Sequence, residues 1–260
     1  MGTAEVQGQV WGVRARDWAE VQEGMYTPLF ETVFRKTSVG ANAALLDIGC
    51  GSGMFCQMAA KLGAQVSGLD AAEPLLAIAR ERVPQGDFRS GEMEALPYAN
   101  RSFDVVAGFN SFQFAASPVN ALREAARVSR PGASVVIVVF GKREDTEAAA
   151  YFAAIGSLLP PPPPGTPGPF ALSVDGALEA LVTEAGMRPE KLEEFDCPWA
   201  YPDERTLLRG LLSPGPGIRA VQHAGEAAAR GAVLKALAPF KTASGGYKLR
   251  NTARYMIVKT

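Results

Sequence analysis

Closely spaced glycines and two acids follow two short apolar segments in the first third of the chain. The first segment is Leu45-Leu46-Asp47-Ile48-Gly49-Cys50-Gly51-Ser52-Gly53, and the second is Gly68-Leu69-Asp70. Glycine lets a ligand approach the backbone closely and adopts positive φ without strain. A carboxylate at the end of the second segment can accept hydrogen bonds from two ribose hydroxyls. The pattern therefore predicts a pocket for a ligand that contains a nucleoside.

The glycine spacing distinguishes two classes of nucleoside ligand. The dinucleotide fingerprint is G-x-G-x-x-G, whereas Gly53 comes one residue early and is followed by Met54. Asp47 precedes the first glycine closely, where a carboxylate disfavours a pyrophosphate and can orient an ammonium group. The ligand should carry a ribose and a cation but no phosphate. S-adenosylmethionine fits this description and NAD does not. After donation of its methyl group, S-adenosylhomocysteine would be the product.

A scaffold of alternating strands and helices must position these residues. Apolar runs alternate with helical segments of about ten residues, which is typical of a parallel sheet with crossover helices. We expect strands at residues 43–47, 65–69, 87–90, 103–108, 134–140, 192–197 and 247–258. We expect helices at residues 18–34 with a break near Pro28, and at 54–62, 74–82, 118–129, 144–159, 173–185, 203–212 and 218–237. The predicted fold class is α/β, with a doubly wound, mostly parallel sheet of seven strands.

The predicted organisation is one domain with three parts. Residues 1–40 form a helical cap, residues 41–142 form the cofactor-binding α/β core, and residues 143–260 complete the sheet and add a helical lid. Ser173 is expected to cap the helix at 173–185, and the Pro- and Gly-rich residues 213–217 are expected to separate two lid helices. The proline run from 160 to 164 predicts an extended surface segment, for which a stiff connector and a ligand for a partner domain both stay open.

Composition and charge limit the partners. The net charge of -1 and the absence of Lys/Arg runs disfavour nucleic acid as a substrate. Three cysteines without a C-x-x-C pair, a single histidine and no clustered acid pairs predict no metal site. The longest aliphatic run, at 135–140, is too short to span a bilayer. We expect a cytoplasmic monomer or homodimer that does not bind membranes, with no signal peptide at its N-terminus.

Five segments occur in the order and spacing of class I S-adenosylmethionine-dependent methyltransferases. The chain most resembles the branch of ubiquinone- and menaquinone-type enzymes and other small-molecule methyltransferases, over about residues 40 to 140. This resemblance implies a Rossmann-like methyltransferase fold. The segments that carry it are residues 47–53, 68–70, 91–98, 102–106 and 127–132.

The resemblance also implies roles for single residues around the donor. The backbone from Gly49 through Cys50 to Gly51 would contact the methionine moiety, with Asp47 nearby. Asp70 would bind the ribose hydroxyls.

Further residues are assigned to the adenine and to the walls. Ala71 would lie against the adenine, and Met93 would offer its backbone N–H to the ring. Glu92 stands where relatives usually have an Asp that accepts from the adenine amino group. Asn110 would line the channel between cofactor and substrate. Two aromatic residues of the N-terminal helices, Trp18 and Tyr26, are candidates for the near wall of the pocket, although simple packing against the sheet explains them as well.

No pattern in the chain selects a catalytic residue. His223, the only histidine, is a candidate general base, but a surface position on its helix fits equally. Candidates for the acceptor pocket are Gln113, which stands where relatives often have a His, together with Phe114, Tyr201, Tyr247 and Arg250.

We therefore expect methyl transfer to a small, largely neutral or apolar metabolite, with O-, N- and C-acceptors all open. Two alternatives remain. One is a protein that binds S-adenosylmethionine without catalysis, as a sensor or assembly partner. The other is an NAD(P)-dependent oxidoreductase.

Overall fold

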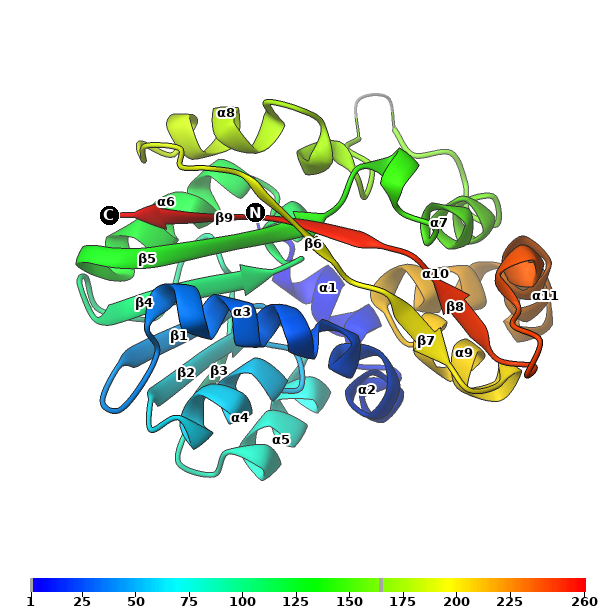
Figure 1. Ribbon diagram of the computed structural model, residues 1–260, viewed down its shortest axis with the longest axis horizontal. Helices are drawn as coiled ribbons and strands as arrows, with labels where there is room; N and C mark the ends of the chain where they lie inside the picture. The colour runs from blue at the N-terminus through cyan, green and yellow to red at the C-terminus, as the bar shows by residue number, and fades with distance from the viewer. Residues whose placement is uncertain (1, 164–165) are drawn as a thin grey trace.

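The centre of the molecule is a seven-stranded sheet in a computed structural model that describes residues 2–163 and 166–260 (Figure 1). The strand order is β3-β2-β1-β4-β5-β9-β6; β9 is antiparallel to both of its neighbours, and the pairs from β3 to β5 are parallel. The doubly wound, mostly parallel fold predicted above is confirmed. The strands are β1 (Ala44–Ile48), β2 (Gln65–Asp70), β3 (Asp87–Ser90), β4 (Phe103–Phe109), β5 (Ser129–Phe140), β6 (Glu193–Asp196) and β9 (Thr252–Lys259).

Helices cover both faces of the sheet because successive strand side chains point to opposite sides. Leu45 and Leu46 of β1 are both fully buried, each in a different apolar cluster. The cluster of Leu45 includes α3 (Thr27–Thr37), α4 (Met54–Lys61) and α5 (Glu73–Arg82). The cluster of Leu46 includes α6 (Pro118–Val128) and α8 (Ala177–Glu184). A three-layer sandwich therefore holds the strand ends rigidly.

A helical cap lies beyond the carboxyl ends of the parallel strands (Figure 1). It is carried by a ribbon of β7 (Trp199–Tyr201) and antiparallel β8 (Tyr247–Leu249), which continue β6 and lead into β9. The cap has an apolar cluster of its own, to which all four of its α-helices contribute. These helices are α7 (Ala149–Gly156), α9 (Glu204–Leu211), α10 (Gly215–Ala224) and α11 (Glu226–Leu237), followed by the 3-10 turn η6 (Ala238–Phe240).

The N-terminal segment forms more helix than expected. Ahead of α3 lie α1 (Ala4–Trp11), α2 (Ala15–Asp17), the π-turn η1 (Trp18–Gln22) and the 3-10 turn η2 (Glu23–Tyr26). The prediction began at residue 18 and missed α1, because Gly8 within it and Gly12 directly after it obscure a helical pattern. These glycines serve close packing: a Cβ on Gly8 would lie 2.3 Å from the carbonyl oxygen of Ala71, and one on Gly12 would lie 2.9 Å from Pro74 Cγ. Helix α1 thus lies directly on the connection between β2 and α5.

Two predictions for the lid helices are wrong. The helix expected at 218–237 is divided at Gly225, whose φ of +87° interrupts it. The residues expected to separate two helices instead include the start of α10, because Pro216 lies in its first turn, where proline is compatible with a helix. The lid therefore has an additional bend.

Other boundaries also differ from the prediction. The Oγ of Ser173 donates to the Phe140 carbonyl at 2.6 Å, in the 3-10 turn η5 (Ala171–Ser173), and α8 begins only at Ala177. The helix expected at 144–159 is confined to α7, after a 3-10 turn η4 (Arg143–Asp145). The closing strand is divided between β8 and β9.

The proline run is only partly described. Pro160, Pro161, Pro162 and Pro163 are exposed and belong to no helix or strand, while Pro164 lies outside the described residues. Across residues 2–163 and 166–260, every helix is too short or too polar to cross a membrane.

Candidate active site

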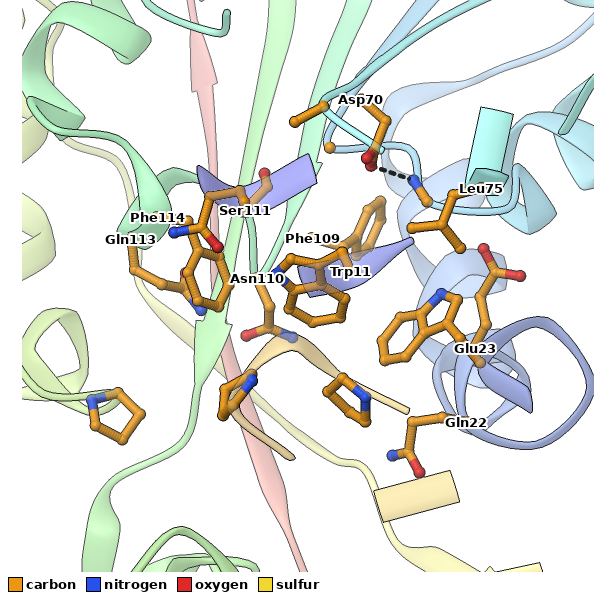
Figure 2. Close-up of a pocket in the computed structure, with 18 of the residues that line it drawn as sticks. Trp11, Gln22, Glu23, Asp70, Leu75, Phe109, Asn110, Ser111, Gln113 and Phe114 are labelled. Carbon is orange, nitrogen blue, oxygen red and sulfur yellow. Dashed lines mark hydrogen bonds between the residues drawn. The ribbon is translucent and has the colours of Figure 1, made fainter. Parts of the chain in front are cut away.

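A cavity of about 420 Å³ opens at the carboxyl ends of five parallel strands. Its lining includes Asp47 and Asp70 from β1 and β2, and Glu92, which follows β3. Asn110 directly follows β4 and Phe140 ends β5. Strand order reverses on the two sides of β1, and ligands of open α/β sheets bind at this point. Figure 2 shows Asp70, Asn110 and Gln113 around a common space in which Trp11 also lies.

The glycine turn after β1 requires glycine at its first position. Gly49 has a φ of +76°, and a Cβ there would lie 2.5 Å from the Cβ of Ser111, which follows β4. Gly51 has a φ of +54°, and its N–H donates to Asp70 Oδ2 at 2.8 Å. The turn therefore lies against the ends of both neighbouring strands, with its backbone exposed to the cavity.

Asp47 is a buried acid without a compensating partner. Its side chain is 3% exposed, and its Oδ1 has no hydrogen-bond partner within the described part of the chain. Burial raises its pKa well above the ordinary value, and the negative charges of Glu23 and Asp70 raise it further. An uncompensated buried charge is costly. A cation bound beside Asp47 would remove this cost, so the acid fits the positively charged methionine end of S-adenosylmethionine.

Asp70 is held rigidly but keeps capacity to bind hydroxyl groups. Its two oxygens accept from the backbone amides of Gly51 and Ala72, each at 2.8 Å. Burial raises its pKa, although these amide hydrogen bonds oppose the rise. A carboxylate has about four lone-pair sites, so about two remain. The arrangement suits two ribose hydroxyls.

A buried ion pair fixes the N-terminal turns over the glycine turn. Arg82 pairs with Glu23 and donates to the carbonyl oxygens of Ala19 and Ser52, each at 2.9 Å. Burial raises the pKa of Glu23, and Arg82 and the Ser52 hydroxyl oppose the rise. The pair thereby places Trp18 beside the site: its indole Nε1 lies 3.2 Å from the position of a Cβ on Gly51 and has no partner within residues 2–163 and 166–260.

Helix α1 closes the cavity from the other side. The Thr3 hydroxyl donates to the Phe114 carbonyl at 2.6 Å, and the Ala4 amide donates to Glu92 Oε2 at 3.0 Å. Trp11 meets the rings of Trp18 and Phe114 edge-on, with centroids 5.2 and 5.6 Å away. Sequence reasoning missed this wall. The role of Glu92 towards an adenine remains a prediction, since its carboxylate here caps α1.

The structure brings together every residue assigned above to the cofactor. They all line the one cavity, as do the acceptor candidates Gln113 and Phe114. The cofactor candidates are Trp18, Tyr26, Asp47, Gly49, Cys50, Gly51, Asp70, Ala71, Glu92, Met93 and Asn110. Their grouping supports the assignment, and their individual contacts with a ligand stay predictions.

Four other candidates lie outside the cavity lining. Tyr247 is buried in the apolar cluster of the cap, and Arg250 is paired with Glu147 at the surface. His223 is exposed on α10 and is therefore not placed to act as a general base. Tyr201 is also buried, but its hydroxyl donates to Gln22 Oε1 at 2.7 Å, and Gln22 lines the cavity. Tyr201 is thus a positioning residue at most.

The cavity continues from the acids into an apolar compartment under the cap. Phe140, Phe152, Ile155 and Trp199 line this part. Between the two parts lie polar atoms that have no partner among the described residues: Asn110 Oδ1, Ser111 Oγ and both amide atoms of Gln113. A reacting polar group would find hydrogen-bond donors and acceptors here.

The sheet order, the antiparallel β9 and the glycine turn between two acids agree with the Rossmann-like fold that the resemblance to class I methyltransferases implies. Residues 46–137 match a family model described as a methyltransferase domain. This match and similarity to proteins named a ubiquinone biosynthesis O-methyltransferase and a demethylmenaquinone methyltransferase confirm the resemblance predicted from the sequence.

Individual relatives agree with this classification. The chain is 41% identical over 96 residues to a ubiquinone biosynthesis O-methyltransferase of Ruegeria pomeroyi, covering 35% of this chain and 39% of that protein. It is 37% identical over 106 residues to a malonyl-[acyl-carrier protein] O-methyltransferase of Erwinia pyrifoliae, covering 41% of this chain and 40% of that protein. The matches thus span about two fifths of these relatives.

The fold extends over most of the chain. The crystal structure of the YcgJ protein from Bacillus subtilis superposes with a TM-score of 0.60 at 18% identity, covering 88% of this chain and 97% of that one. This likeness supports the architecture beyond the matched domain, including the completion of the sheet.

Proposed function

We propose that this protein transfers a methyl group from S-adenosylmethionine to a small-molecule acceptor. One observation carries the proposal: the buried carboxylate of Asp47, whose Oδ1 has no partner among the described residues, lies beside a glycine turn and a rigid Asp70, in a cavity that continues into an apolar compartment. The acids fit the cation and the ribose of the donor, and the apolar compartment fits an acceptor. Because the matched relatives are covered only in part, the reaction itself is inferred from this site.

The residues around the cavity have separate tasks in this proposal. S-adenosylmethionine supplies a methyl group that its sulfonium makes electrophilic. Asp47 orients the methionine end, and the turn at Gly49 allows close approach of the backbone. Trp11 and Trp18 exclude water from the donor side. Holding the acceptor in line near the methyl group at about 3 Å supplies most of the rate enhancement, so an acceptor that is already nucleophilic needs no general base.

The proposal includes the setting of the protein. We place it in the cytoplasm, without a nucleic-acid partner, as a monomer or homodimer. The three cysteines Cys50, Cys56 and Cys197 are free and buried, which fits a reducing compartment.

Formation of S-adenosylhomocysteine tests the proposal. The protein should convert S-adenosylmethionine in the presence of some member of a panel of phenols, amines and acidic carbon compounds, followed by mass spectrometry. Asp70→Ala should lose this conversion, whereas Asp104→Asn, near the start of β4 and so at the edge of the sheet opposite the cavity, should retain it. Tight donor binding without transfer to any acceptor would favour the non-catalytic alternative.

A further inference from the structure

The cavity has an uneven distribution of charge. The acids that line it, Glu23, Asp47, Asp70 and Glu92, all lie at the β1–β3 side or on the N-terminal turns over it. Among residues 2–163 and 166–260, Arg219 of α10 is the single Lys or Arg in the lining. The donor half is therefore acidic, and the only cation stands on the cap.

Arg219 is available to a ligand. It is exposed, and it forms no ion pair or side-chain hydrogen bond with another described residue, unlike most of the arginines around the site. It follows Pro216, another lining residue, by three positions, so both lie on one face of α10. Arg219 therefore lines the cavity from the cap while its side chain stays exposed to solvent, so it can pair with an anionic group of a bound molecule.

The opposite end of this compartment is polar and buried. Asn110 and Gln113 present amide atoms that have no partner within the described residues. Phe140, which ends β5, and Phe152 of α7 also line the cavity, with ring centroids 5.2 Å apart. A matching molecule has a nucleophilic polar group at its buried end, an apolar body and an anionic group at its outer end.

We propose that the methyl acceptor is an amphipathic anion, an aryl or alkyl carboxylate or its equivalent, whose acidic group pairs with Arg219. The inference rests on the proposed function and departs from one expectation from the sequence, that the acceptor is largely neutral. Arg219 then sets specificity, because a guanidinium binds a carboxylate through two parallel hydrogen bonds. It does not touch the reacting atoms.

Matched acids and esters test this assignment. Isothermal titration in the presence of saturating S-adenosylhomocysteine would compare caffeate with methyl caffeate, and laurate with methyl laurate. The protein should bind the better acid of the two roughly five- to tenfold more tightly than its ester. This range lies between the upper value for an exposed ion pair and the lower limit for a hydrogen bond to a charged group, because Arg219 is exposed. Arg219→Gln should remove this preference, and Arg230→Gln, an exposed position of α11 outside the lining, should keep it.

The outcomes separate the two proposals. If S-adenosylhomocysteine itself fails to bind, the proposed function fails. If it binds but neither acid is preferred, or neither acid binds, or the preference survives in Arg219→Gln, the assignment of Arg219 alone is wrong. A tenfold loss of S-adenosylhomocysteine affinity in Arg219→Gln would instead assign this arginine to the carboxylate of the cofactor and overturn the inference.

Discussion

Replacing Asp47 with Asn should change donor affinity and protein stability in opposite directions. The substitution keeps the shape of the side chain and removes the charge that should bind the donor. A hydrogen bond to a charged group contributes about 1.5–3 kcal/mol, which corresponds to about a 10- to 150-fold loss of S-adenosylmethionine affinity. The free protein should become more stable, because the buried Asp47 Oδ1 has no partner among the described residues.

The gain in stability should depend on pH with a definite sign. Burial raises the pKa of Asp47 in the folded protein. A raised carboxyl pKa contributes stability that is complete below the unfolded pKa of about 4 and is lost as pH rises through the folded pKa. Asp47→Asn avoids this loss, so its advantage should be smallest near the unfolded pKa and grow with pH. An advantage of about 1 kcal/mol would raise the melting temperature by about 2–4 °C.

Asp104→Asn is the matched control. Asp104 is the second residue of β4, at the edge of the sheet opposite the cavity; it accepts from the Ala44 amide at 2.9 Å and pairs with Arg130. Its replacement should leave donor affinity unchanged and slightly lower stability. Isothermal titration and thermal unfolding of both variants measure the two effects. Unchanged donor affinity in Asp47→Asn, or lower stability that does not vary with pH, would refute the role given to this acid.

Three further predictions test other parts of the site. Gly49→Ala should abolish S-adenosylhomocysteine binding. The new Cβ would lie 2.5 Å from Ser111 Cβ, and a positive φ costs about 1–2 kcal/mol for residues other than glycine. Normal affinity in a titration would show that the turn tolerates a side chain. The affinity for S-adenosylmethionine should rise with pH above the ordinary carboxyl pKa of about 4, because the bound cation requires an ionised Asp47 and burial raises the pKa of this acid. Calorimetric titration in buffers of different ionisation enthalpy should therefore detect release of a proton on binding. Uptake of a proton would contradict the prediction. Arg82→Met should lower the free energy of unfolding in urea by about 3 kcal/mol, because Glu23 is then buried without its cation. Adding Glu23→Gln should restore most of this loss. An unchanged free energy of unfolding in Arg82→Met would show that the ion pair does not stabilise the fold.

The donor half of the site could be predicted because its residues are close in sequence and lie at neighbouring strand ends. Asp47 pairs in register with Gly68 and Ile48 with Leu69, so the turn after β1 and the acid ending β2 necessarily meet. The glycine spacing and the two acids are local patterns, and the sheet follows from buried apolar runs between helices.

The walls that α1 and the cap add to the cavity could not be predicted because long-range contacts build them. Trp11 reaches the cavity at the end of α1. This helix packs on Ala71 and Pro74 through Gly8 and Gly12, so the packing does not produce a helical pattern of apolar residues in the sequence. Arg219 reaches the cavity on a cap carried by a ribbon that leaves the sheet. The same reason explains the misplaced candidates: Tyr247 and His223 belong to the cap, but the first is buried in its apolar cluster and the second is exposed, and neither lines the cavity.

Titration of the wild-type protein with S-adenosylmethionine, S-adenosylhomocysteine and NADH tests the central claim most directly. The acids Asp47 and Asp70 should admit the two nucleosides that lack phosphate and exclude the dinucleotide. Binding of S-adenosylmethionine and S-adenosylhomocysteine without NADH is the predicted result. Binding of NADH alone would contradict the account and point to an oxidoreductase.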